Sequence, residues 1–321
     1  MRRLVSFLFA VFLLIVLCSC ELSFHAPAVG KMHILVYGND YYYLGHNPSV
    51  VRFEDGSKYE GVAARKLNGT VSDAVEVGNA LYALAEKSGY KDSVDITFLT
   101  DFDHTNLASF KTAISNISAD SSVNDVTILY FSCHGFYLRG KGNRVDYGTD
   151  ITSESFIVFR NDEYVYENVL YPISKALSLI ESIRGTKVVL SDFCYSGAFV
   201  QPDYFSVTFG EYNEMDTVTL FSKYRDAIAV NSDLFCLSAA RYYEESHEPG
   251  SGHGYFTKAL LEGLGWDEEQ QAIVSPRAEK NGRISLHELA KYVTANDSEP
   301  SWASQTPMVS GGSNDIVLFS F

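Results

Sequence analysis

Two apolar segments, each followed by a chemically active side chain, place the tightest limits on how this chain can fold. Residues 126–131 form a β-rich apolar run that leads into Ser-Cys-His-Gly, and residues 188–190 form a second that leads into Ser-Asp-Phe-Cys-Tyr-Ser-Gly. A continuous apolar run bounded by turn residues is typical of a strand buried on both faces, as in a parallel sheet. Because ligands bind at the carboxyl ends of such strands, we expect His134 and Cys194 to share one edge of a sheet. A cysteine and a histidine that meet in space can act as nucleophile and base.

Composition narrows the possible partners. The 321 residues are enough for one large domain or two small ones, and hydrophobic residues make up 46% of them. The formal net charge of −15 argues against nucleic acid as a partner, because phosphate binding needs a basic surface. An acidic surface favours basic peptides, or it simply keeps the protein soluble.

The N-terminus has the features of a secretory signal. Two arginines precede an apolar run over residues 4–17, which is shorter than the ~20 residues of a membrane span. Leu-Cys-Ser-Cys at residues 17–20 resembles a bacterial lipobox, with Cys20 as the lipidated residue. We therefore expect a signal peptide over residues 1–19, a tether over 20–30 and an exported lipoprotein anchored in a bacterial cell envelope. Simple cleavage near Ser19 or an uncleaved anchor is the alternative.

The cysteines do not form a disulfide framework. If Cys20 begins the mature chain, only Cys133, Cys194 and Cys236 follow it. Three is an odd number, so at least one thiol stays free even in an exported protein. A cysteine enzyme requires such a free thiol.

Strands and helices alternate along the chain. Apolar patterns predict strands at residues 33–38, 94–99, 126–132, 188–190, 234–239 and 316–319, and helices near 70–89, 107–117, 173–183 and 256–264, with another opening in a capping box at 285–288. Residues 136–155 are polar and glycine-rich and predict a loop. This alternation predicts βαβ units, a mostly parallel sheet and a single α/β domain over residues 31–321.

The order of the motifs resembles one known family. A strand ending in Ser-x-His-Gly, followed by one ending in Asp-x-Cys-x-Ser-Gly, is similar to the caspase-like cysteine peptidases, closest to their metacaspase and bacterial branch. The segments 67–74, 98–101, 237–245 and 254–260 resemble further parts of that family in the same order. The resemblance implies an α/β fold, a caspase-like three-layer sandwich with a six-stranded, mostly parallel sheet and helices on both faces.

The resemblance also implies roles for individual residues. Cys194 corresponds to the nucleophile and His134 to the general base and acid, while Gly135 and the backbone N–H of Cys194 correspond to the oxyanion hole. Asp192 and Asp73 match acidic positions that bind a basic P1 side chain, so cleavage after Arg or Lys is expected. Each residue also has a simpler interpretation: a buried cysteine, a hydrogen-bonded histidine, a turn glycine, or an aspartate at a helix N-terminus.

Other positions bear on processing and on departures from the family. Lys223 and Arg225 lie where relatives often cleave themselves, although a solvated loop explains them equally simply. The chain has Cys133 where the family usually has Gly, and Phe193 where it usually has a small residue. Both departures bear on the shape of the substrate cleft.

No cofactor or metal is implied by these motifs. Residues 277–288 faintly resemble a calcium-binding EF-hand loop, but Arg277 stands where a carboxylate ligand is needed, so a turn before a helix is the better interpretation. Calcium dependence therefore stays possible but has no assignable site.

The sequence thus predicts a cysteine endopeptidase acting on peptide or protein substrates and held at the membrane by an N-terminal lipid. A catalytically silent lipoprotein of the same fold, serving as a binding or scaffolding module, is the first alternative. A clostripain- or legumain-like enzyme is the second. The substrate and the oligomeric state do not follow from the sequence.

Overall fold

The computed structural model describes residues 30–41, 50–59, 64–90, 93–138, 154–163, 166–200, 233–250, 252–297, 304–310 and 315–321. The predicted signal peptide, Cys20, Lys223 and Arg225 lie outside these residues. Among the helices in the described part of the chain, none is both long and apolar enough to span a bilayer.

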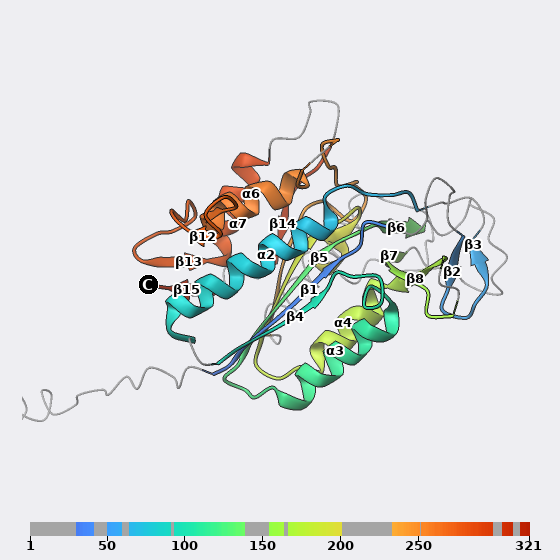
Figure 1. The fold of residues 1–321 in the computed structure, drawn as a ribbon, viewed down its shortest axis with the longest axis horizontal. Coiled ribbons are helices and arrows are strands. Elements are labelled where there is room, and N and C mark those ends of the chain that lie inside the picture. The colour runs from blue at the N-terminus through green and yellow to red at the C-terminus, as the bar shows by residue number, and fades with distance from the viewer. Residues whose placement is uncertain are drawn as a thin grey trace, which may run out of the picture.

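A six-stranded sheet forms the centre of the domain (Figure 1). Its order is β14-β10-β9-β5-β1-β4, and every neighbouring pair is parallel except β10 and β14. The inner strands are buried along nearly their whole length, which explains their continuous apolar sequence. The predicted sheet is therefore confirmed; its strands are β1 Met32–Gly38, β4 Val94–Leu99, β5 Val126–Ser132, β9 Thr186–Asp192, β10 Leu234–Ser238 and β14 Met308–Val309.

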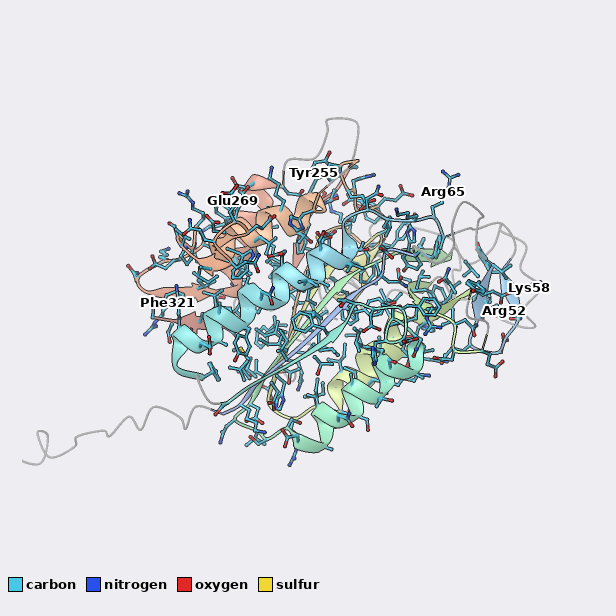
Figure 2. All side chains as sticks on the ribbon, viewed as in Figure 1. Arg52, Lys58, Arg65, Tyr255, Glu269 and Phe321 are labelled. Atoms are coloured by element: carbon cyan, nitrogen blue, oxygen red, sulfur yellow. The ribbon has the colours of Figure 1, made fainter. Side chains whose placement is uncertain are left out.

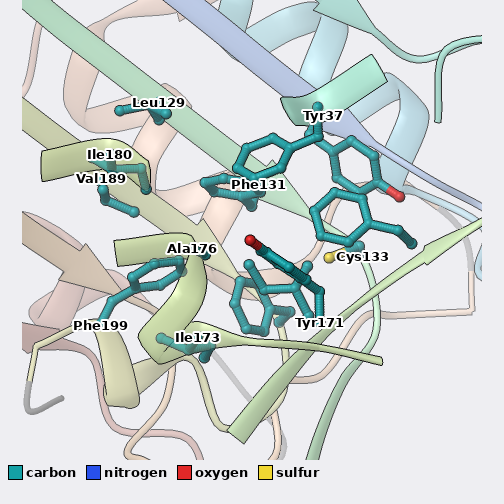
Figure 3. Close-up of a cluster of buried hydrophobic side chains, with 14 of the residues drawn as sticks. Tyr37, Leu129, Phe131, Cys133, Tyr171, Ile173, Ala176, Ile180, Val189 and Phe199 are labelled. Carbon is teal, nitrogen blue, oxygen red and sulfur yellow. The ribbon is translucent and has the colours of Figure 1, made fainter. Parts of the chain in front are cut away.

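Helices cover both faces of this sheet and complete three layers (Figure 1). Alternate residues of β1 supply two separate cores: Ile34 and Val36 pack with α2, α6 and α7, whereas Leu35 and Tyr37 pack with α3 and α4. Figure 3 shows part of the second core, which is rich in aromatic rings. The helices are α2 Thr70–Ala85, α3 Leu107–Asp120, α4 Ile173–Glu181, α6 Tyr255–Leu264 and α7 Leu286–Asn296.

A second sheet, which the sequence pattern did not predict, lies beside the carboxyl ends of the central strands (Figure 1). The prediction of a loop over residues 136–155 is wrong at both ends, because β6 begins directly after His134 and β7 begins at residue 154. These strands are held mainly by pairing between distant segments, which leaves little local signal. The sheet has the order β3-β2-β8-β7-β6; its strands are β2 Val51–Phe53, β3 Lys58–Tyr59, β6 Gly135–Leu138, β7 Glu154–Arg160 and β8 Asn168–Pro172.

The C-terminal segment also differs from its prediction. The strand expected at residues 316–319 exists as β15 Val317–Ser320, but it pairs antiparallel with β13 Arg283–Ser285 outside the central sheet. The short β14 takes the edge position instead. A second small hairpin joins β11 Trp266–Asp267 to β12 Ala272–Ile273.

The N-termini of α7 and α2 are capped in different ways. Ser285 caps α7, and its hydroxyl accepts a hydrogen bond from the backbone N–H of Glu288, as the capping box predicted. The cap of α2 is Gly69, which provides no side-chain cap. A side chain at Gly69 would collide with the backbone of Gly252, since an added Cβ would lie 2.3 Å from its carbonyl oxygen.

Candidate active site

The register of two central strands brings the predicted histidine and cysteine to neighbouring positions. Ser132, the last residue of β5, pairs with Asp192, the last residue of β9. His134 and Cys194 each follow two residues later, at the carboxyl edge of the sheet. A Cβ added to Gly135 would lie 1.9 Å from the carbonyl oxygen of Cys194, so the two chain segments touch. The predicted meeting of these segments in space is thus present in the structure.

The His134 ring is held by the segments on either side of it. Its Nε2 lies 2.7 Å from the carbonyl oxygen of Arg65, in the segment that leads into α2 (Arg65 is labelled in Figure 2). A carbonyl only accepts, so Nε2 carries the proton and the neutral ring has its lone pair on Nδ1. The rings of Tyr41 and Phe136 lie 4.7 and 6.2 Å from the imidazole, centroid to centroid. Burial lowers the pKa of His134, which favours the neutral ring that a general base requires.

Hydrogen bonds also hold the backbone of His134 in place. Its N–H donates to the Tyr41 hydroxyl at 3.0 Å, and that hydroxyl donates to the Val158 carbonyl oxygen at 2.8 Å. The Val158 N–H in turn donates to the His134 carbonyl oxygen at 3.1 Å. The sequence analysis missed this role for Tyr41, which stands in a tyrosine-rich stretch without periodicity.

Cys194 sits at a sharp turn after β9. The next residue, Tyr195, has φ of +65°, a conformation that non-glycine residues adopt rarely and often at functional sites. The Tyr195 N–H donates to the Glu244 carbonyl oxygen at 2.7 Å, which holds the turn against the chain after β10. The Cys194 thiol is half-buried and donates to the Ser246 carbonyl oxygen at 3.5 Å.

The electrostatic surroundings keep this thiol protonated. Burial raises the pKa of Cys194 to about 12, and the negative charges of Glu245 and Asp192 act in the same direction. A cysteine in this state needs a base to take its proton before it can attack a carbonyl.

Both departures from the family pattern face the core. Cys133 is 4% exposed and belongs to the aromatic core on the α3/α4 side, where Figure 3 labels it. Phe193 is 1% exposed, and its ring lies edge-on to Phe131 and Phe199. An added Cβ on Gly135 would also come within 2.6 Å of the Phe193 ring. The two unusual side chains therefore pack in the core directly beneath the site.

Asp192 lies buried below the Cys194 turn. One carboxylate oxygen accepts from the Ser246 hydroxyl at 2.5 Å, and the other accepts from the N–H and hydroxyl of Thr257 at 3.2 and 2.6 Å. Burial, together with the negative charge of Asp73, raises the pKa of Asp192 to about 7. Among the described residues, the donors to Asp192 are the uncharged groups of Ser246 and Thr257.

Asp73 is the second carboxylate of the site and is 1% exposed. It lies in the first turn of α2, as the simpler interpretation proposed, but its side chain turns inward to the end of β5. One oxygen accepts from the Ser132 hydroxyl at 2.8 Å, and the other lies 2.6 Å from Nδ1 of His253. Burial raises the pKa of Asp73, while His253 and Ser132 oppose that rise.

More residues contact Asp73 and Asp192 than the sequence motifs indicated. Ser132 was visible within the Ser-x-His-Gly motif, but it was assigned no role. Ser246 and His253 lie in the segment after β10, outside every predicted motif. Thr257 lies in α6, within the segment 254–260 that resembles the family, but it was assigned no role.

Two other predicted features can be placed. The chain between Arg277 and Glu288 contains a turn, β13 and the first residues of α7, and Glu288 forms ion pairs with Lys280 and Lys291. The described cysteines Cys133, Cys194 and Cys236 are all free thiols.

One group of described residues has the donor types of a metal site, far from this edge. His33, Asp95 and Asp120 lie together at the amino end of the central sheet. The Lys31 ammonium lies 2.8 Å from Asp120 and 3.5 Å from Asp95, where it already neutralises the carboxylates. The cluster is therefore accounted for as an ion-pair network.

The fold and this edge together define a three-layer α/β domain with a cysteine and a histidine on adjacent strand ends. Residues 55–310 match the caspase domain of the peptidase C14 family, and the chain belongs to that family. At this level, membership supports a cysteine-peptidase type of function that acts on a protein substrate.

Two solved structures resemble this chain, and the first of them supports the fold. The protein GSU0716 from Geobacter sulfurreducens superposes with a TM-score of 0.51 at 16% identity, covering 87% of this chain and 92% of that one. Caspase-1 from Spodoptera frugiperda superposes with a TM-score of 0.45 at 11% identity, covering 92% and 91%. No curated protein matches the sequence.

Proposed function

We propose that this protein is a cysteine endopeptidase in which Cys194 is the nucleophile and His134 the general base and acid. The observation that carries the proposal is the register of β5 and β9, which brings the two residues to adjacent strand ends. The hydrogen bond from Nε2 of His134 to the Arg65 carbonyl oxygen supports it further, because that bond leaves the Nδ1 lone pair to receive a proton.

In the proposed reaction, the substrate carbonyl enters beside the Cys194 turn. As the sulfur attacks the carbonyl carbon, its proton passes to His134, and the C=O electron pair moves onto oxygen. The backbone N–H groups of Gly135 and Cys194 stabilise that oxyanion, and the contact between these residues supports such a pairing. The imidazolium then protonates the leaving amine, and water hydrolyses the thioester to restore the thiol.

We further propose that Asp73 and Asp192 select a basic P1 residue. Both carboxylates are buried next to the Cys194 turn, and the donors to Asp192 in the described part of the chain are neutral. An arginine or lysine side chain of the substrate would supply the missing positive charge through charge-assisted hydrogen bonds.

A panel of fluorogenic peptides with P1 Arg, Lys, Asp, Asn or Ala tests both parts of this proposal. Wild-type protein and Cys194→Ala are assayed side by side, with and without calcium. We expect cleavage after Arg or Lys that the substitution abolishes. Cleavage after Asp alone would overturn the basic P1 pocket. No cleavage of any peptide by folded protein would favour the alternative of a silent binding module.

Processing of the chain is a separate proposal. Lys223 and Arg225 are the expected cleavage sites if the enzyme cuts itself after basic residues. Wild-type protein should then separate into two fragments on a denaturing gel, whereas Cys194→Ala stays intact. Fully active protein that remains a single band would show that such cleavage does not occur.

A further inference from the structure

The two buried aspartates Asp73 and Asp192, here called the acidic pocket, already have a positively charged group of the protein beside them. Nδ1 of His253 lies 2.6 Å from a carboxylate oxygen of Asp73, and Nε2 lies 2.9 Å from a carboxylate oxygen of Glu268. Ionised carboxylates only accept, so both ring nitrogens must donate, and a neutral imidazole has a single N–H. The contacts therefore describe an imidazolium held between two carboxylates.

The backbone around His253 lies directly over both aspartates. An added Cβ on Gly254 would lie 2.4 Å from a carboxylate oxygen of Asp192, and the Gly254 N–H donates to Asp73. On the other side, the Gly252 carbonyl oxygen packs against Gly69 at the start of α2. Glycines on both sides of His253 allow this close approach, and Gly252 has φ of +88°. The segment thus covers the place where a basic P1 side chain would have to enter.

From this arrangement we infer that His253 is a tethered internal cation that occupies the P1 pocket in the free enzyme and that a basic substrate side chain must displace. The inference rests on the proposed function, since it concerns the same pocket. It assigns His253 a role in specificity and affinity, not in the chemistry of the peptide bond.

The displacement follows from charge balance. With His253 charged, Asp73 is neutralised, so an arriving guanidinium competes with the imidazolium for that carboxylate. With His253 neutral, Asp73 keeps an uncompensated charge in a buried place, and an external cation is favoured there. Binding of a substrate cation and binding of a proton to His253 are therefore coupled negatively, and the coupling is reciprocal.

The charges around His253 support this direction. The hydrogen bond with Asp73 raises the pKa of His253, and the charges of Asp73 and Glu268 also raise it against the effect of burial. Asp192 from β9 and Glu248 from the loop after β10 interact electrostatically with Asp73, and the Tyr130 hydroxyl of β5 faces both aspartates. Apart from His253 itself, all of these titratable groups are acids, so the pocket retains a net demand for positive charge.

Benzamidine, a small amidinium, provides a direct probe of the pocket that does not depend on catalysis. Its Kd is measured by calorimetry with full-length protein in detergent, using Cys194→Ala with and without His253→Ala. We expect the His253→Ala substitution to tighten binding about tenfold near pH 6, within the usual range for coupled sites, and by less near pH 9. Because the pKa of Asp192 is about 7, the measurement near pH 9, where this carboxylate is ionised, separates its titration from the effect of His253. Equal or weaker binding after His253→Ala near pH 6 would overturn the inference, because it would mean that His253 does not compete with the bound cation.

Three further measurements keep the inference testable if His253→Ala does not fold. Benzamidine should lower the pKa of the His253 imidazole, which is measured by NMR titration of the Cys194→Ala protein. Glu268→Gln, at a residue whose side chain is 56% exposed, should lower the same pKa and tighten benzamidine binding. An imidazole signal that neither change affects would contradict the inference. His104→Ala, which removes an exposed histidine paired with Asp101, is the matched control and should leave benzamidine binding unchanged.

Peptide hydrolysis separates this inference from the proposed function. In an active enzyme, His253→Ala should lower KM for arginine peptides near pH 6 and leave kcat unchanged. Cleavage after arginine with no change in KM would reject the role of His253 and retain the peptidase. Benzamidine coupling without cleavage of any peptide would retain the occupied cation pocket and reject the peptidase.

Discussion

Ser132 and Asp192 are register partners at the ends of two adjacent parallel strands. This one pairing places His134 and Cys194, each two residues further on, beside each other. It also places the two partners themselves in the acidic pocket, where Ser132 donates to Asp73. The proposed nucleophile, the proposed base and the proposed P1 pocket therefore all depend on the same strand alignment, and a shift of one residue would separate them.

The assignment of the dyad predicts distinct effects for the free cysteines. Cys194→Ala should reduce peptide hydrolysis to background, and His134→Ala should lower kcat/KM by about 10²–10⁴-fold, the usual range for general acid–base catalysis. Cys133→Ala is the matched control, because this thiol lies in the core. Iodoacetamide labelling followed by mass spectrometry should modify Cys194 in folded protein and spare Cys133. Activity that persists in Cys194→Ala would disprove the assignment.

The contact between Gly135 and Cys194 predicts that position 135 tolerates no side chain. Gly135→Ala places a methyl group 1.9 Å from the Cys194 carbonyl oxygen, so the turn must move. We expect a loss of about 1–3 kcal/mol in the free energy of unfolding, as for other overpacked sites, together with a large loss of kcat. Gly250→Ala is the control, since its added Cβ would meet no atom within 4 Å. Unchanged activity in Gly135→Ala would argue against an oxyanion hole at this position.

The raised pKa of Asp192 predicts how stability depends on pH. The pKa is about 7 in the folded protein and lower, near the ordinary value of 3.8, in the unfolded chain. Between these values the folded state binds the extra proton, so the free energy of unfolding falls as the pH rises from about 4 to about 7, by at most about 1.4 kcal/mol per pH unit from this group. Asp192→Asn should flatten that part of the profile, measured by urea denaturation. The pKa values of His253 and Asp73 are also raised, so these groups likewise make the free energy of unfolding fall as the pH rises. Both groups remain in the variant, so the slope that they cause should persist there.

The same substitution has a consequence for substrate choice. Asp192→Asn should reduce the preference for P1 Arg over P1 Ala above about pH 8, because the ionised carboxylate is then missing from the pocket. The measurement compares kcat/KM for the two peptides in both proteins. A preference that survives intact would mean that Asp73 alone recognises the basic side chain.

The hydrogen bonds of the Tyr41 hydroxyl predict that this side chain supports His134. Tyr41→Phe removes the hydroxyl that accepts from the His134 N–H and donates to the Val158 carbonyl oxygen. Leaving these buried groups without that partner should cost about 1–3 kcal/mol in the free energy of unfolding and should also lower kcat. Tyr166→Phe is the control, since Tyr166 is 71% exposed. Equal stability of the two variants would show that the hydroxyl does not support His134.

The proposed lipid anchor rests on sequence alone and has its own test. Wild-type protein expressed in a bacterium should incorporate radiolabelled fatty acid and partition into detergent. Cys20→Ser should lose both properties, because the acceptor thiol is gone. A Cys20→Ser protein that still partitions into detergent would show that another segment holds the protein at the membrane.

Local sequence determined five of the six strands of the central sheet, all except the edge strand β14, together with the two strand ends. The apolar runs before Ser132 and Asp192 are long, continuous and flanked by turn residues, so they identify buried parallel strands without any knowledge of the fold. The polar residues that follow these runs could be placed at one edge because parallel strands end together. The helices of both outer layers were found for the same reason, from apolar residues at helical spacing.

Only the tertiary structure decided the surroundings of that edge. The second sheet depends on pairing between distant segments such as β2 and β8, which leaves little periodic pattern in either sequence. The same holds for the groups that complete the site: the Arg65 carbonyl oxygen, the Tyr41 hydroxyl and the His253 ring come from separate loops and act through contacts across the fold. Sequence therefore determines which strand ends lead into His134 and Cys194, through local hydrophobic patterning. Long-range packing determines what holds the histidine and what fills the acidic pocket, because hydrogen bonds and ion pairs between distant segments exist only once the chain has folded.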